Sequence, residues 1–204
     1  MITLYDYWRS SASYRVRIAL GLAGLDWQAM AVNLVEGQHK TREHLARNPQ
    51  GLVPVLEIDG LRLTQSLAIV EYLDETRDLG LLPARPADRA RVRAIAHAVA
   101  MDIHPICNLG TGRHAVSASD GAITMEGWMQ HFIGRGLAAV EAMLPGGDFC
   151  WAEGVTLADL CLMPQVYNAE RWQVDMSEMP KIRRVAETLA AIPAFAAAHP
   201  DRWA

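Results

Sequence analysis

The spacing of apolar and polar positions changes several times within the first eighty residues, as it does where strands and helices alternate. Residues 2–7 and 27–32 have the pattern of strands. Between them, residues 13–23 follow the period of an amphipathic helix that ends at Gly24. A polar loop then leads to a short helix predicted over residues 41–46. The pattern therefore predicts a strand–helix–strand unit followed by a second helix.

A β-hairpin is predicted next, because Asp59-Gly60 separates two apolar runs at residues 53–58 and 61–64. Ser66 then begins a helix that ends in charged residues near Arg77. The predicted element order of this first part of the chain is βαβαββα.

The predicted linker, residues 78–87, contains two prolines and a glycine. It separates a first domain, residues 1–80, from a second domain, residues 87–204. Apolar residues after the linker recur with the 3.6-residue period of helices. The sequence therefore predicts an α/β domain followed by an all-helical domain.

One helix start in the second domain has a clear capping pattern. Thr156 is followed three positions later by Asp159, and an apolar run begins between them. We expect a structural role for both residues and a largely buried helix through Met163. Pro164 is expected to kink or end that helix.

Composition narrows the class of protein. Hydrophobic residues make up 51% of the chain, enough for substantial cores. No apolar stretch is long enough for a membrane span, and no secretory signal is visible. The net charge of −4 comes from interspersed charges, which argues against a nucleic-acid partner. Three cysteines without a Cys-x-x-Cys motif fit a reducing compartment, and we expect the cytoplasm.

The run of residues 9–17, which includes a hydroxyl-rich turn, carries the clearest candidate chemistry. It places Ser10, Ser11 and Ser13 between the first strand and the first helix. Exposed N–H groups and the helix dipole stabilise an anion at such a helix start, and serine hydroxyls add donors, so a thiolate or a carboxylate fits there. The alternative is that Ser11 or Ser13 only caps the helix.

Several motifs together resemble the zeta-class glutathione transferases, specifically the maleylacetoacetate isomerase group. They are the Arg-Ser-Ser-x-Ser turn, Asn48-Pro49, Val53-Pro54, Ile58-Asp59-Gly60, Gln65-Ser66-Leu67-Ala68-Ile69, Leu81-Leu82-Pro83, and the stretch from Thr156 to Arg171. The resemblance covers nearly the whole chain. It implies a thioredoxin-like domain that binds glutathione, an all-helical domain that completes the substrate pocket, and a homodimer.

The resemblance also implies roles for individual residues. Ser11 would hydrogen-bond the glutathione sulfur and favour its thiolate, and Ser10 could share that role. Ala12 stands where the isomerases commonly carry cysteine, so the sulfur comes from glutathione. The Val53–Pro54 bond is expected to be cis. The glutathione-binding candidates are Ser11, Gln38, His39, Gln50, Val53, Pro54, Gln65 and Ser66.

The second substrate is expected to contact four residues. Arg9 and Arg171 suit a dicarboxylate, because guanidinium groups pair with carboxylates through two hydrogen bonds. His104 and Asn108 are candidate donors near the end of the first helix of the second domain. The spacing of His97, His104 and His114 does not suit a metal site, so no metal is expected.

The implied reaction is glutathione-dependent cis–trans isomerisation of maleylacetoacetate to fumarylacetoacetate, a step of aromatic amino-acid catabolism. It proceeds by thiolate addition, bond rotation and elimination. Three alternatives stay open: a maleylpyruvate isomerase, a transferase that conjugates small electrophiles such as α-haloacids, and a noncatalytic glutathione-binding protein.

Overall fold

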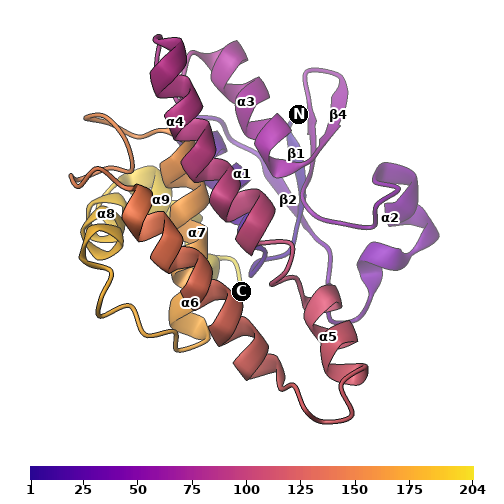
Figure 1. Cartoon of the computed structure of the whole chain (residues 1–204). Helices are drawn as coiled ribbons and strands as arrows, with labels where there is room; N and C mark the ends of the chain where they lie inside the picture. Colours follow the sequence, from indigo (N-terminus) through magenta and orange to yellow (C-terminus); the bar gives the residue numbers. More distant parts are fainter. The chain divides into compact units, whose positions relative to one another are not determined.

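The computed structural model describes all residues from 1 to 204 (Figure 1). Contacts within the chain divide it into two units. The first unit comprises residues 1–80 together with residues 192–204, and the second comprises residues 81–191. The last residues of the chain therefore pack with the first unit, whereas the sequence pattern placed them with the helical domain.

The first unit is built on a four-stranded sheet with the strand order β2-β1-β3-β4. Its strands are β1 (Thr3–Asp6), β2 (Gln28–Ala31), β3 (Val55–Ile58) and β4 (Leu61–Thr64). β1 pairs parallel with β2 and antiparallel with β3. β3 and β4 form the predicted hairpin, and both Asp59 and Gly60 have the positive φ that its tight turn requires.

The helices of the first unit follow the predicted order. They are α1 (Ser11–Leu22), η1 (Gln38–Lys40), α2 (Arg42–Arg47) and α3 (Ser66–Arg77), joined at the end of the chain by α9 (Pro193–Ala198) and η3 (Pro200–Arg202). Within this unit, Figure 1 shows α2 on the opposite side of the strands from α1 and α3. The thioredoxin-like order βαβαββα is confirmed.

Buried charge in α1 ties this helix to the sheet. The Arg17 guanidinium is fully buried and lies 2.5 Å from the Asp6 carboxylate at the end of β1. A buried charge needs such a partner, because an isolated ion in the interior is strongly unfavourable. α1 therefore has a fixed position relative to the strand from which the chain enters it.

The second unit is entirely helical, as the apolar period predicts. Its elements are α4 (Pro86–His97), the π-helix η2 (Ala98–Ile103), α5 (Leu109–Ser117), α6 (Met125–Met143), α7 (Leu157–Arg171) and α8 (Pro180–Ala190). No helix of the chain has the length and apolar character needed to cross a membrane.

The α7 helix differs from the prediction because it continues through Pro164 to Arg171. Proline removes one backbone donor from a helix, but burial of most of the residues in α7 holds the helix together around it. Its start is as predicted. The Asp159 carboxylate accepts hydrogen bonds from the Thr156 N–H and hydroxyl, at 2.8 and 2.6 Å, and from the Cys150 N–H at 2.8 Å. The structural role of Thr156 and Asp159 is confirmed.

Gly136 allows α6 to pack closely against the end of η2. A Cβ atom at Gly136 would lie 2.4 Å from Cγ1 and 2.6 Å from Cδ1 of Ile103, which is buried. Gly134 on the same helix differs, since the nearest atom to its Cβ would be Val174 Cγ1 at 3.5 Å, an ordinary contact.

A Gly136→Ala variant should therefore lower the free energy of unfolding by about 1–3 kcal/mol, the usual cost of overpacking. Gly134→Ala should be neutral or stabilising by up to about 1 kcal/mol, because alanine is the better helix former. Denaturant titration measures both. Combining Gly136→Ala with Ile103→Ala should cost less than the two single losses added together. Simple additivity, or equal effects at the two glycines, would contradict this packing argument.

Candidate active site

The serine turn lies at the start of α1, where the two neighbouring serines have different surroundings. Ser10 is the N-cap, and its Oγ accepts a hydrogen bond from the Ser13 N–H at 3.2 Å. The interpretation of Ser11 or Ser13 as the cap is therefore wrong, and the helix begins at Ser11 rather than Ser13. Ser11 is 9% exposed, and its hydroxyl makes no hydrogen bond within the chain. Ser11 is thus the hydroxyl available to a ligand at this helix start.

A second helix start, that of α3, carries the next two candidates. Gln65 is the N-cap and Ser66 the first helical residue, so the predicted start of this helix at Ser66 is confirmed. Gln65 has φ 66° and ψ 112°. Such a conformation costs a residue other than glycine on the order of 1–3 kcal/mol and is concentrated at ligand sites.

Arg15 brings positive charge to this second helix start. Its Nη1 donates a hydrogen bond to Ser66 Oγ at 3.0 Å, and both side chains are buried. A guanidinium and a helix N-terminus both favour an anion, so this place suits a carboxylate.

Gln50 and His39 lie next to these groups. The Gln65 side chain donates from Nε2 to Gln50 Oε1 at 2.7 Å. A Cβ at Gly51, which has φ +63°, would come within 3.1 Å of the His39 carbonyl oxygen. The fold therefore brings three predicted glutathione-binding residues, His39, Gln50 and Gln65, to neighbouring positions.

Asn48 holds the loop that presents Gln50. Its Oδ1 accepts from the Gln50 N–H at 3.1 Å, and its Nδ2 donates to the Leu52 carbonyl at 2.9 Å. His44 Nε2 lies 3.0 Å from the same carbonyl oxygen. Sequence reasoning missed His44, because a histidine in a short polar helix gives no sign that it will be buried.

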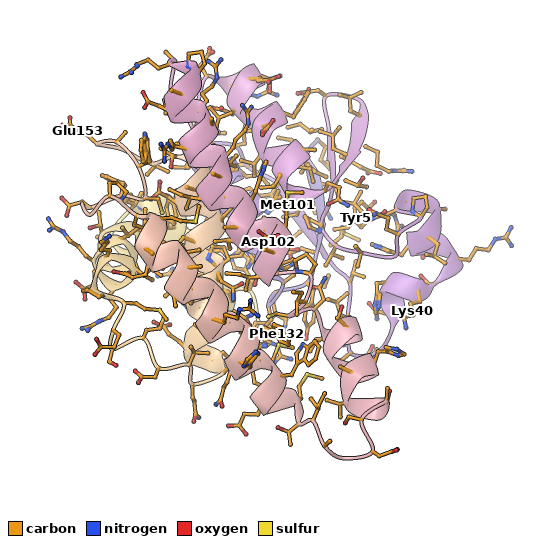
Figure 2. All side chains as sticks on the ribbon, in the orientation of Figure 1. Tyr5, Lys40, Met101, Asp102, Phe132 and Glu153 are labelled. Atoms are coloured by element: carbon orange, nitrogen blue, oxygen red, sulfur yellow. The ribbon has the colours of Figure 1, made fainter.

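Gln38, by contrast, is occupied within its own loop. Its Oε1 accepts from the Asn33 N–H at 2.8 Å, and its Nε2 donates to Glu36 at 3.3 Å. Lys40, two residues further on, extends into solvent (Figure 2). The structure therefore gives Gln38 a local structural role, and its predicted contact with glutathione is not supported by its hydrogen bonds.

The peptide bond between Val53 and Pro54 is cis, as expected. Val53 packs in a buried cluster with Tyr7 and Val32, and Trp8 packs against the same cluster. Tyr7 and Trp8 lead directly into the serine turn. The start of β3 is therefore close to the segment that positions Ser11.

Arg9 belongs to the same turn and is held by aromatic side chains. Its Nη2 donates to the Tyr7 hydroxyl at 3.0 Å, and its guanidinium lies 4.6 Å from the centre of the Trp8 ring. Its buried Nε has no hydrogen-bond partner. Arg9 is thus a preorganised cation immediately before Ser10 and Ser11, which suits an acidic ligand.

Two of the other substrate candidates, His104 and Asn108, follow the end of η2 in the second unit. The His104 N–H donates to the Val99 carbonyl at 2.9 Å, which continues the π-helical pattern to this residue. π-Helical turns are frequent at functional sites. Met101 and Asp102, on the same turn, are exposed (Figure 2).

The segment that follows His104 is fixed to α5 and α6. The Trp128 indole donates to the Ile106 carbonyl, and the Thr111 hydroxyl donates to the Pro105 carbonyl, both at 3.0 Å. Asn108 is the N-cap of α5. Arg171 is the last residue of α7, and its guanidinium lies 5.0 Å from the centre of the Trp172 ring. Of the four predicted substrate residues, Arg9 lies in the first unit, and His104, Asn108 and Arg171 lie in the second.

No cysteine of the chain is suited to act as a nucleophile. Cys107, Cys150 and Cys161 are free and buried. Burial raises the pKa of the Cys107 thiol to about 11, and it raises the pKa of Cys150 well above the usual value. The Cys107 and Cys150 thiols therefore stay protonated at neutral pH, and we expect a thiolate at the serine turn to come from a ligand. No group of three or more metal-binding side chains comes together.

Comparison with known proteins agrees with this geometry. The family model for the glutathione S-transferase N-terminal domain matches residues 1–75. The maleylacetoacetate isomerase of Rhizobium meliloti (strain 1021) is 61% identical, and the match covers 98% of this chain and 96% of that protein.

Two solved structures resemble the whole chain. A bacterial zeta-class glutathione S-transferase, a maleylpyruvate isomerase in its holo form, has a TM-score of 0.92 and 40% identity, covering 97% of this chain and 96% of its own. A maleylacetoacetate isomerase from Methylobacterium extorquens AM1, with bound malonate and GSH, has a TM-score of 0.92 and 37% identity, covering 98% and 97%. The chain therefore belongs to the maleylacetoacetate isomerase family of zeta-class glutathione S-transferases.

Proposed function

We propose that the protein is a glutathione-dependent isomerase that converts maleylacetoacetate to fumarylacetoacetate. The observation that carries this proposal is the Ser11 hydroxyl, which makes no hydrogen bond within the chain and lies at the N-terminus of α1, while Ser10 is occupied as the cap. The high identity to a maleylacetoacetate isomerase over nearly the whole chain supports the same reaction.

The residues of the first unit fit glutathione along its length. Ser11 donates to the sulfur, and the α1 N-terminus favours the thiolate over the thiol. Ser66, with Arg15 beside it, receives the γ-glutamyl carboxylate at the α3 N-terminus. Gln65 and Gln50 bind next to this carboxylate, Val53 and Pro54 face the cysteinyl part, and His39 lies toward the glycine end.

Bound glutathione supplies a thiolate that adds to the cis alkene, which lets the former double bond rotate, and then leaves to restore a trans alkene. Arg9 and Arg171 orient the acidic substrate through its carboxylates. The same guanidinium groups stabilise the negative charge that develops on the substrate during addition. His104 and Asn108 donate hydrogen bonds to the substrate.

The reaction is tested with the purified protein, both cis substrates and a substoichiometric amount of glutathione. We expect many turnovers of maleylacetoacetate to the trans product, resolved by chromatography, with total glutathione unchanged. Faster turnover of maleylpyruvate would assign the second isomerase reaction instead. Consumption of glutathione with a covalent product from α-haloacids would identify a conjugating transferase, and absence of any turnover would support a binding protein.

We also infer that the protein is a homodimer that works in the cytoplasm. Three free, buried cysteines fit a reducing compartment. Sedimentation analysis of the purified chain tests the dimer, and a monomeric mass at assay concentration would contradict it.

A further inference from the structure

A single buried side chain, Arg17, makes three separate contacts in the first unit. Besides the Asp6 carboxylate, its Nη2 donates to the Trp8 carbonyl at 3.0 Å and its Nε donates to the Ala198 carbonyl at 3.1 Å. The first contact holds the end of β1, the second holds the chain just before the serine turn, and the third holds the end of α9.

The Trp8 carbonyl is part of the turn that presents the serines. The Ser10 N–H donates to the Tyr7 carbonyl at 2.8 Å, which closes the backbone around Trp8 and Arg9. The N–H of Tyr14, one turn into α1, donates to the Ser10 carbonyl at 2.9 Å. A shift of the Trp8 carbonyl therefore moves the backbone on which Ser11 depends for its position.

The last residues of the chain also contact Arg17, through Trp203 and Ala198. The Trp203 ring lies 5.6 Å from the Arg17 guanidinium and stacks on Trp27 at 5.5 Å. Its indole N–H donates to the Ala197 carbonyl at 3.0 Å. Ala194 of α9 packs against Gly21 of α1, where a Cβ would be only 3.3 Å from the Ala194 side chain. Residues 192–204 thus pack against α1, and the Trp203 ring lies over the Arg17 guanidinium.

We propose that Arg17 is a positioning residue. It couples the packing of the C-terminal segment, residues 192–204, against α1 to the geometry of the serine turn. A guanidinium has a planar set of donors, so it can hold Asp6, Trp8 and Ala198 at once, which a lysine ammonium on its flexible chain does less precisely. When the segment is displaced, the guanidinium loses one of its three anchors, and the Trp8 carbonyl loses its fixed partner. The inference rests on the proposed use of Ser11 to stabilise the glutathione thiolate.

Two variants and one control test the coupling. Trp203→Ala removes the ring over Arg17 and the indole hydrogen bond to the Ala197 carbonyl, so it loosens the segment that presents the Ala198 carbonyl to Arg17. Arg17→Lys keeps the charge but loses the planar set of donors. Arg202→Ala changes an exposed neighbour on the same segment and serves as the control. The pKa of the bound glutathione thiol is measured by the ultraviolet absorbance of its thiolate. The affinity for S-methylglutathione, which has no free thiol, measures binding by the other glutathione-binding residues.

We expect the pKa of the bound thiol to rise by about half a unit in Trp203→Ala and by about one unit in Arg17→Lys, roughly threefold and tenfold shifts in the thiol–thiolate equilibrium. S-Methylglutathione affinity should change less than twofold, and Arg202→Ala should match the wild type. An unchanged thiol pKa in a folded variant would overturn the coupling, even if stability falls. If Arg17→Lys does not fold, the thiol pKa measured with Trp203→Ala decides whether the coupling exists. The titration needs no second substrate, so a wild type that lowers the thiol pKa without isomerase activity would overturn only the proposed reaction.

Discussion

A Ser11→Ala variant is expected to lose about tenfold to a hundredfold in kcat/KM, because a hydrogen bond to a charged group contributes about 1.5–3 kcal/mol. The Ser11 hydroxyl makes no hydrogen bond within the chain, so removing it should leave the fold intact. The same change should raise the pKa of the bound glutathione thiol, since the thiolate loses its donor. Activity should then fall most at low pH, where the fraction of thiolate becomes limiting.

Ser10→Ala is the matched comparison, since it removes the hydroxyl of the adjacent residue. Its Oγ accepts from the Ser13 N–H, so its loss should lower the free energy of unfolding by about 1 kcal/mol, as for other N-cap serines. Steady-state kinetics and denaturant titration separate the two effects. If Ser10→Ala abolished activity while Ser11→Ala kept it, the roles assigned to the two serines would have to be exchanged.

The sequence was sufficient to predict the elements whose signals are local. The Asp59-Gly60 hairpin, the order of strands and helices, and the capping pair Thr156 and Asp159 follow from short patterns that the structure confirms. The cis bond at Val53–Pro54 is also confirmed, but its basis was the family resemblance. Turn chemistry and capping work over a few residues, so neighbours in the sequence were enough.

Features that depend on distant residues were not predictable in the same way. Arg15 next to Ser66 and Arg17 next to Ala198 both join segments far apart in the chain. A pattern of residue types does not show which helix face a buried arginine will use or what will pair with it. The choice of cap among three nearby serines also depended on backbone angles, which placed Ser10 outside the helix and Ser11 inside it.

Asp159→Ala should be the most destabilising of these single changes, with a loss of about 3–5 kcal/mol, because it leaves several buried donors without an acceptor. The carboxylate accepts three hydrogen bonds, from the N–H groups of Cys150 and Thr156 and from the Thr156 hydroxyl. Cys150, Thr156 and Asp159 are all buried. Burial raises the pKa of Asp159, and the hydrogen bonds from Cys150 and Thr156 oppose that rise. The donors therefore offset much of the cost of placing this carboxylate inside the protein.

Two further variants distinguish the effect of losing the helix cap from the effect of losing a negative charge. Asp159→Asn keeps one of the two acceptor oxygens and should lose about 1–3 kcal/mol. Asp148→Ala removes an exposed carboxylate that pairs with Arg184 at 2.8 Å, and it should cost less than about 1 kcal/mol. Denaturant titration ranks the three variants. A domain of ordinary stability has only about 5–15 kcal/mol in total, so where Asp159→Ala is recovered unfolded, Asp159→Asn gives the measurable difference. Equal losses at Asp159 and Asp148 would show that the three buried donors find other acceptors and that the cap does not organise α7.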